Sequence, residues 1–222
     1  MFTKRSRRIT VAAALAVTVT IAIVLIITMS STSTRTAAQP HTSQCPPTTL
    51  GTSIPTAPPP DLRWKSIGPV LVPTSATEGP ASYDGPVWTC YAHTPIGAVL
   101  AAYDIFAALA SPDWRTVADH EVVPGQGQQA FIQAGDQQTY QAPAPGEIAP
   151  AVGFEVLSYT PQQATIEALA DAGEDYQADE RTVAWIDGDW KMVLTSDGAS
   201  GPDTQLITSA DGFVLWGSAG NG

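Results

Sequence analysis

Residues 9–29 form an uncharged run of 21 residues, and this run constrains the fold of the chain more than any other feature. As an α-helix rising about 1.5 Å per residue it would span about 31 Å, which matches the hydrocarbon core of a bilayer. The four basic residues that flank the run all precede it, and positive residues favour the cytoplasmic side. The sequence therefore predicts a single-pass protein of the cell membrane, with a cytoplasmic tail at residues 1–8 and a transmembrane helix at residues 9–29.

A cleaved signal peptide is the alternative interpretation of this N-terminus, with residues 36–38 (Thr-Ala-Ala) as its cleavage site. The apolar region of a signal peptide normally has roughly 7–15 residues, and the run here is longer. We therefore favour an uncleaved anchor. The residues before Cys45 lack the apolar and small side chains of a lipid-attachment site. In every version the C-terminal domain lies outside the cell.

Residues 30–60 differ in composition from the rest of the chain. They contain 5 Ser, 8 Thr and 7 Pro and few side chains that a core would bury. Such a segment cannot offset the entropy lost on ordering. We predict a stalk at residues 30–60, followed by one extracytoplasmic domain at residues 61–222, which is long enough to build a core without a metal or a disulfide framework.

The charges of the chain are divided between its two ends. All 21 acidic residues but only five of the ten basic residues lie from Asp61 onward, so residues 61–222 carry a net charge of −16. A surface with this much negative charge repels the phosphate backbones of DNA and RNA. The sequence therefore argues against a nucleic-acid partner for this domain.

The chain has two cysteines, Cys45 and Cys90. In an oxidising compartment the two can form a disulfide. The alternative is that Cys90 is a small buried side chain and Cys45 a free thiol, and the sequence leaves both readings open. Neither cysteine has a further Cys or His at the spacing of a zinc site, so no metal is expected.

The periodicity of the domain changes from helical to strand-like along the chain. Thr94 followed by Pro95 is a helix start signal, and apolar residues then recur at helical spacing to about Ala110. After a proline-rich loop at residues 140–150 the apolar residues alternate with polar ones. The expected strands are residues 63–72, 85–91, 153–159, 164–170, 181–186 and 189–195, and the expected helices are residues 95–110, 112–121 and 128–134. This order predicts an α+β domain with an antiparallel meander.

The last two expected strands are joined by Asp187-Gly188, a strong signal for a type I′ hairpin turn. A two-residue turn places Ile186 opposite Asp189 and Trp185 opposite Trp190. An aromatic cross-strand pair of this kind stabilises a hairpin by about 0.2–1 kcal/mol. We interpret Asp187, Gly188, Trp185 and Trp190 as structural residues of the hairpin.

Several side chains are candidates for chemistry, and each has a structural alternative that we favour. Asp104 is the single charge on an otherwise apolar helix, and burial would raise its pKa. The favoured alternative places it on the one exposed stripe of that helix. His120 and Glu121 are neighbours that point in different directions, so a solvated edge is the better interpretation.

Residues 171–180 contain five acidic residues without the spacing of a calcium loop, and we expect a solvated hairpin loop there. Four tryptophans outside the hairpin are expected in the core, with the lining of a ligand pocket as the alternative; they are Trp64, Trp88, Trp114 and Trp216. We assign no catalytic residue, no metal ligand and no cofactor.

Two segments of the domain carry a family likeness. Residues 93–98 (His-Thr-Pro-Ile-Gly-Ala) and residues 183–192 (Val-Ala-Trp-Ile-Asp-Gly-Asp-Trp-Lys-Met) resemble an uncharacterised family of membrane-anchored proteins of high-GC Gram-positive bacteria that is linked to conjugative elements. Residues 212–217 are similar to the C-terminal pattern of that family. More broadly, the domain resembles the nuclear-transport-factor-2-like cone fold, which assembly subunits of type IV secretion systems share. The resemblance implies helices packed on a curved antiparallel sheet.

A shared fold does not define a function, and three classes of function remain. The first is a non-enzymatic assembly or scaffolding component of a cell-envelope machine, with conjugative transfer as the machine that the resemblance implies. Its partners would be the membrane and other envelope proteins. The second is a ligand-binding or sensory ectodomain, and the third is a cone-fold enzyme that uses Asp104. We favour the first; the sequence does not define the oligomeric state.

Overall fold

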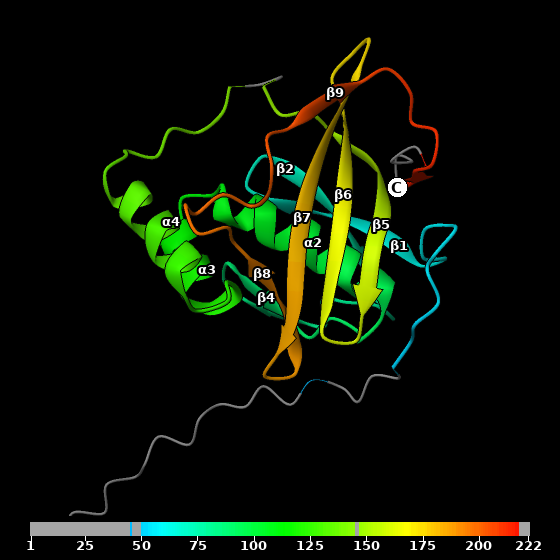
Figure 1. Cartoon of the computed structure of the whole chain (residues 1–222), viewed down its shortest axis with the longest axis horizontal. Coiled ribbons are helices and arrows are strands. Elements are labelled where there is room, and N and C mark those ends of the chain that lie inside the picture. Colours follow the sequence, from blue (N-terminus) through cyan, green and yellow to red (C-terminus); the bar gives the residue numbers. More distant parts are fainter. Residues whose placement is uncertain (1–44, 46–49, 145–146, 218–222) are drawn as a thin grey trace, which may run out of the picture. The chain divides into compact units, whose positions relative to one another are not determined.

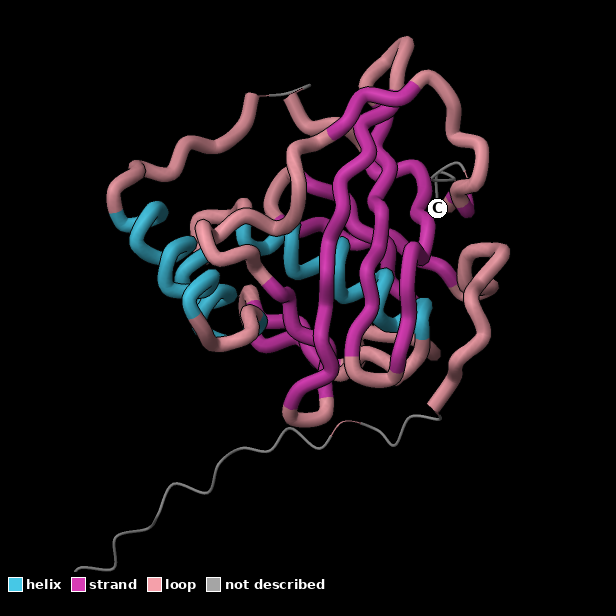
Figure 2. The backbone as a smooth tube through the Cα atoms, viewed as in Figure 1, coloured by secondary structure: helices cyan, strands magenta, loops and turns pink. Residues whose placement is uncertain are grey.

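The computed structural model describes Cys45 and residues 50–144 and 147–217. The predicted tail, the predicted transmembrane helix and most of the predicted stalk lie outside these residues. Within them, no helix is long and apolar enough to cross a membrane. The described part is an α+β domain that contains a mainly antiparallel sheet and three helices (Figures 1 and 2).

The domain begins earlier than the sequence predicts. The compact unit that contains the described residues starts at Cys45, whereas the predicted boundary is Asp61. The Gly51 N–H donates a hydrogen bond to the His93 carbonyl (3.2 Å), and the Tyr159 hydroxyl donates to the Gly51 carbonyl (3.1 Å). Residues 50–60 therefore belong to the domain and not to the predicted stalk. The sequence did not show this, because the segment has no apolar pattern of its own and is held by contacts with distant residues.

The main sheet has the strand order β10-β5-β6-β7-β8. Its strands are β5 (Ala151–Thr160), β6 (Gln163–Asp171), β7 (Tyr176–Ile186), β8 (Asp189–Val193), β9 (Gln205–Ile207) and β10 (Val214–Leu215). β7 is long enough to pair with β8 near its C-terminal end and with β9 near its N-terminal end, and all these pairings are antiparallel. The predicted strands from residue 153 to residue 195 agree with β5 to β8 within a few residues, except that β7 begins earlier. The short strands β9 and β10 were not predicted.

Two small hairpins replace two strands expected near the start of the domain. The expected strand at residues 63–72 is two strands, β1 (Leu62–Ile67) and β2 (Val70–Ser75), joined at Gly68-Pro69. Gly68 has a φ of +56°, a left-handed conformation that suits glycine at a turn. The expected strand at residues 85–91 is shorter and forms β4 (Val87–Thr89), which pairs with β3 (Ser82–Asp84).

Helix α2 (Pro95–Leu109) is the centre of the core. Its N-terminus agrees with the prediction, because the Thr94 side chain accepts a hydrogen bond from the Gly97 N–H and proline occupies the first turn. α2 contacts β5 to β8 of the main sheet and also β1, β2 and β4. In Figures 1 and 2 it crosses one face of the main sheet. This double contact buries almost the whole helix.

Two further helices, α3 (Trp114–Glu121) and α4 (Gln126–Asp136), follow α2. α3 contacts α2, α4, β4 and β8. α3 begins two residues later than the expected start at residue 112, since Asp113 is the residue before the helix and makes no side-chain cap. The Ser111 hydroxyl instead accepts a hydrogen bond from the Asp113 N–H (3.2 Å) in the preceding turn.

Candidate functional site

The β7–β8 hairpin has the register that a two-residue turn requires. Trp185 pairs with Trp190 and Ile186 pairs with Asp189, and Asp187 and Gly188 at the turn have φ values of +54° and +86°. The Trp185 and Trp190 rings pack edge to face, with centroids 5.2 Å apart. In this arrangement Trp185, Asp187, Gly188 and Trp190 have the structural role that the sequence predicts for them.

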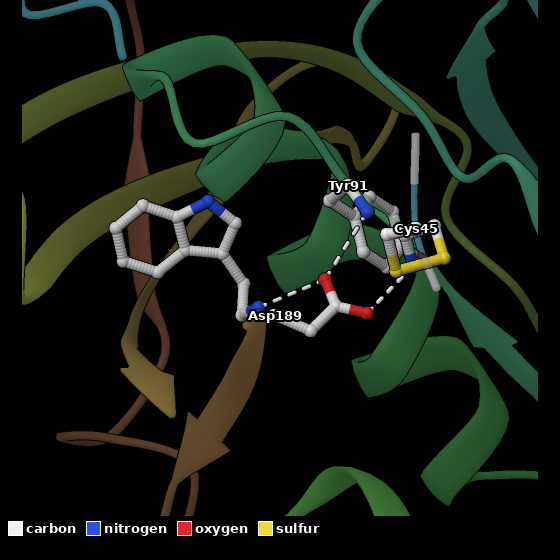
Figure 3. The surroundings of a disulfide bond; sticks show 5 residues. Cys45, Tyr91 and Asp189 are labelled. Carbon is white, nitrogen blue, oxygen red and sulfur yellow. Dashed lines mark hydrogen bonds between the residues drawn. A yellow bond between two sulfur atoms is a disulfide. The ribbon is translucent and has the colours of Figure 1, made fainter. Parts of the chain in front are cut away.

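Asp189 has a role that the sequence analysis missed, because there it appeared only as the residue opposite Ile186 in the hairpin. Its carboxylate is buried and accepts hydrogen bonds from the backbone N–H groups of Cys90 (2.6 Å), Tyr91 (3.1 Å) and Trp190 (2.9 Å) (Figure 3). Burial raises the pKa of Asp189, and the three N–H groups oppose that shift. Asp189 therefore connects the hairpin, through hydrogen bonds, to the segment at Cys90 and Tyr91, which lies about a hundred residues earlier in the chain.

The same segment carries the disulfide. Cys45 and Cys90 are joined, and they are the two cysteines of the chain (Figure 3). Cys90 has a φ of +70°, which is uncommon for a residue other than glycine. The Asp189 carboxylate stabilises this conformation through the Cys90 N–H. The sequence left open whether Cys45 and Cys90 are joined or free, and in the structure they form a disulfide.

Asp104 lies in the core and not on an exposed stripe of α2, so the favoured sequence interpretation is wrong. It is 1% exposed. Its Oδ2 accepts a hydrogen bond from the Tyr91 hydroxyl (2.9 Å), while its Oδ1 has no partner among the described residues. Burial raises the pKa of Asp104 well above its usual value, although the Tyr91 hydroxyl opposes the shift. The interior therefore favours the neutral form of Asp104 over the charged one.

Glu121 also lies in the interior, which corrects the expected solvated edge at His120 and Glu121. His120 is exposed, but Glu121 is 3% exposed and is positioned by the last turn of α3. Burial raises the pKa of Glu121 to about 8; the negative charge of Asp189 adds to the shift and Lys191 opposes it. Asp104, Glu121 and Tyr91 line one tightly packed region.

The raised pKa of Glu121 predicts that the domain loses stability as the pH increases. Its folded pKa of about 8 lies above the unfolded value of 4.5, so the protonated form favours folding. This contribution is complete below pH 4.5 and is lost as the pH rises through 8, at up to about 1.4 kcal/mol per pH unit. We expect Glu121→Gln to be more stable than the wild type at pH 8, with the difference shrinking toward pH 5, in urea unfolding followed by tryptophan fluorescence.

Glu147→Gln is the matched control for this prediction, because Glu147 is exposed. Its pH profile should follow the wild type. Some pH dependence will remain in Glu121→Gln, since burial also raises the pKa of Asp104 and of Asp189. Identical slopes in the wild type and in Glu121→Gln would contradict the assignment.

The acidic residues between positions 171 and 180 lie partly at the β6–β7 turn and partly within β7. No group of three or more His, Cys, Asp or Glu side chains within the described residues is placed to hold a metal ion. Asp171 and Glu174 are exposed at the β6–β7 turn, as expected for a solvated loop. Asp179 lies within β7 and pairs with Arg181, which the sequence analysis did not anticipate.

The four tryptophans outside the hairpin lie in different places. Trp216 is in the core, 3% exposed, with Trp64 packed edge to face against it at a centroid distance of 6.4 Å. Trp88 packs on Tyr83 and Trp114 on Phe131. Trp64 and Trp114 also line hollows, and for these two the ligand-pocket alternative stays a prediction.

An apolar cavity of about 290 Å³ lies between α2, β2, β6 and β7. α2 contributes Tyr103, Phe106 and Ala107 to its wall, at positions spaced three and four apart along the helix, and Ala110 follows directly after the helix. β7 contributes alternate residues, which point to one face of a strand: Gln177, Asp179 and Arg181. A volume near 300 Å³ is at the lower end of the range for small-molecule sites.

The cavity continues into a second hollow of about 390 Å³. The two share seven lining residues, among them Leu71, Ile148 and Ala151. The second hollow extends to Trp64 and Pro150 and has no charged side chain in its lining. We call these two adjoining hollows together the β2 cleft.

Arg181 is the buried cation of the β2 cleft. It is 6% exposed, its Nε donates a hydrogen bond to Asp179 Oδ2 (2.6 Å), and its guanidinium carbon lies 3.7 Å from the centre of the Phe106 ring. A buried arginine needs a carboxylate partner and an aromatic face to offset its desolvation. Arg181 has both, and it brings charge to an otherwise apolar cleft.

A third hollow, of about 760 Å³, lies beside α3 and α4. Its lining includes Trp114, Phe131 and Tyr140 and has no charged side chain. The β2 cleft is the stronger candidate site because it combines an apolar lining with a buried ion pair.

The family described as Domain of unknown function (DUF8175) matches residues 27–215 of the chain. The chain belongs to this family. The DUF8175 match contains the predicted stalk and all the elements from β1 to β10. No curated protein and no solved structure matches the chain.

Proposed function

We propose that the chain is a non-enzymatic assembly component of a cell-envelope machine, held in the cell membrane by the helix predicted at residues 9–29. Its domain lies outside the cell, and the machine is the conjugative apparatus that the family resemblance suggests. In this proposal the domain has a cone-like fold in which helices pack on a curved sheet. The observation that carries the proposal is the β2 cleft, an apolar site in a strongly acidic domain.

The edge of the β2 cleft is suited to contact with another protein. Leu71 is 51% exposed and Phe106 is 36% exposed, and both line the cleft. Large apolar side chains grouped around a hollow are typical of interaction sites. The net charge of −16 in residues 61–222 adds a long-range attraction for a basic partner. We therefore expect a partner that inserts apolar side chains into the cleft and carries Lys or Arg residues around them.

A change at the edge of the cleft should abolish capture of this partner. We expect Leu71→Asp to reduce the partner recovered with the full-length chain from solubilised membranes at least tenfold, because a charged carboxylate is placed in an apolar contact. The measurement is quantitative mass spectrometry of proteins co-purified from the native host.

Leu157→Asp is the matched control. Leu157 is 46% exposed, close to the value for Leu71, but it lies on β5 and does not line the cleft. It should retain the partner. Equal losses in both variants would place the partner elsewhere. Loss of cellular function in Asp104→Asn at unchanged stability and membrane level would favour an enzyme instead.

A ligand-binding ectodomain is the second candidate function, and the interior of the β2 cleft favours it. Exposed apolar side chains are enough for a protein contact, but a protein contact does not require a buried arginine such as Arg181. A charged group in an apolar hollow is typical of small-molecule sites, where a few polar groups orient the ligand.

A further inference from the structure

The polar end of the β2 cleft is a single row of side chains on β7. Gln177, Asp179 and Arg181 are alternate residues of that strand, and all three line the cavity. On β6, Ala170 pairs with Gln177 and Ala168 with Asp179. These alanines and Ala107 of α2 line the same cavity, and their small side chains leave the space open beside the polar row.

Arg181 has hydrogen-bonding capacity that the described residues do not use. A guanidinium has five N–H donors, and the hydrogen bond to Asp179 uses the one on Nε. The Nη groups have no acceptor among the described residues, although Arg181 is 6% exposed. The Nη groups are not among the side-chain atoms that are buried without a partner. Because Arg181 lines the cavity, these groups are accessible there to the acceptor atoms of a ligand.

Outside the first hollow, where Ser111 and Thr204 also line the wall, the cleft offers the side chains of a ligand almost nothing to hydrogen-bond with. The second hollow is lined by proline, alanine and aliphatic side chains together with Trp64. A peptide would bring an N–H and a C=O for every residue, and leaving these groups unpaired is costly. A hydrocarbon chain brings none, so the lining favours a hydrocarbon tail over a peptide.

We propose that the β2 cleft binds an amphipathic monocarboxylate of the fatty-acid class. The carboxylate accepts hydrogen bonds from the Arg181 Nη groups, in the planar two-point geometry that arginine favours. The hydrocarbon tail lies along Leu71 and Ile148 toward Trp64. This inference deepens the ligand-binding function proposed above and rests on it.

A single negative charge fits this site better than a double one. Asp179 already neutralises Arg181 through its Oδ2, and residues 61–222 carry a net charge of −16. A dianionic phosphate would meet repulsion from both. A carboxylate carries one charge and matches the free end of the guanidinium.

The test uses the full-length chain in detergent-free peptidiscs and equilibrium dialysis with ¹⁴C-octanoate and ¹⁴C-octanol. These probes share their chain length and differ in the charged head. We expect octanoate to bind at least tenfold more tightly than octanol. The double variant D179N/R181Q should lose this preference and still bind octanol. Ala170→Leu should weaken both probes at least tenfold, because it fills the hollow without changing a charge.

R115Q/D136N is the matched control, since this pair is the other ion pair among the described residues and is half exposed outside the cleft. It should bind both probes like the wild type. Equal binding of octanoate and octanol by the wild type would refute the carboxylate assignment and leave the ligand-binding function standing. Binding of neither probe would refute both. A short peptide with an apolar, free C-terminus that binds more tightly than octanoate would replace the fatty-acid class.

Discussion

Asp189→Ala is expected to destabilise the domain by at least about 3 kcal/mol. The substitution leaves three backbone N–H groups without an acceptor, those of Cys90, Tyr91 and Trp190. Each buried unsatisfied group costs about 1–3 kcal/mol. The measurement is the urea midpoint of the purified chain, read from tryptophan fluorescence.

Two neighbouring substitutions make this prediction specific. Asp189→Asn keeps one acceptor oxygen and removes a buried charge, so its effect should be clearly smaller than that of alanine. Asp187→Asn changes the exposed aspartate two positions earlier, at a φ of +54° that asparagine tolerates. We expect an effect below about 0.5 kcal/mol there. A loss of less than 1 kcal/mol in Asp189→Ala would show that the carboxylate does not hold the Cys90 segment.

The elements that could be predicted from the sequence depend on local patterns. The Asp187-Gly188 turn fixes the hairpin register, and Thr94-Pro95 marks the start of α2, because each signal acts within a few residues. The strands β9 and β10 have three and two residues, which is too short for an alternation to show. The strand expected at residues 63–72 was wrong because the Gly68-Pro69 turn was not recognised within an apolar pattern.

The features of the candidate site could not be predicted in the same way, because distant parts of the chain build them. Asp189 bonds to residues 98 and 99 positions away. The β2 cleft is lined by Ala107 on α2 and Ala168 on β6, and an alanine in a sequence does not show whether its neighbours fill the space beside it. Arg181 looked like a strand residue of the hairpin. Its burial depends on Phe106 from another element.

Removal of the disulfide is the second change with a large expected effect. Cys45 and Cys90 are 45 residues apart, and a cross-link that closes a loop of this length removes much of the entropy of the unfolded chain. In the loop-entropy description this stabilises the folded state by about 4 kcal/mol. Cys45→Ser should therefore lower the free energy of unfolding by about that amount.

Treatment with a reductant distinguishes the effect of losing the disulfide from the effect of the serine side chain. Dithiothreitol should destabilise the wild type to the level of Cys45→Ser and leave the variant unchanged, because the chain has no other cysteines. A variant that is as stable as the oxidised wild type would mean that the cross-link does not contribute.

The same bond tests the proposed location of the domain. Disulfides form and persist outside the cytoplasm, so an extracytoplasmic domain should be isolated from native membranes with Cys45 and Cys90 already joined. Maleimide labelling under denaturing conditions should then find no free thiol until a reductant is added. Two free thiols in freshly prepared membranes would contradict the proposed location, whereas the predicted stability difference would still hold for the oxidised protein.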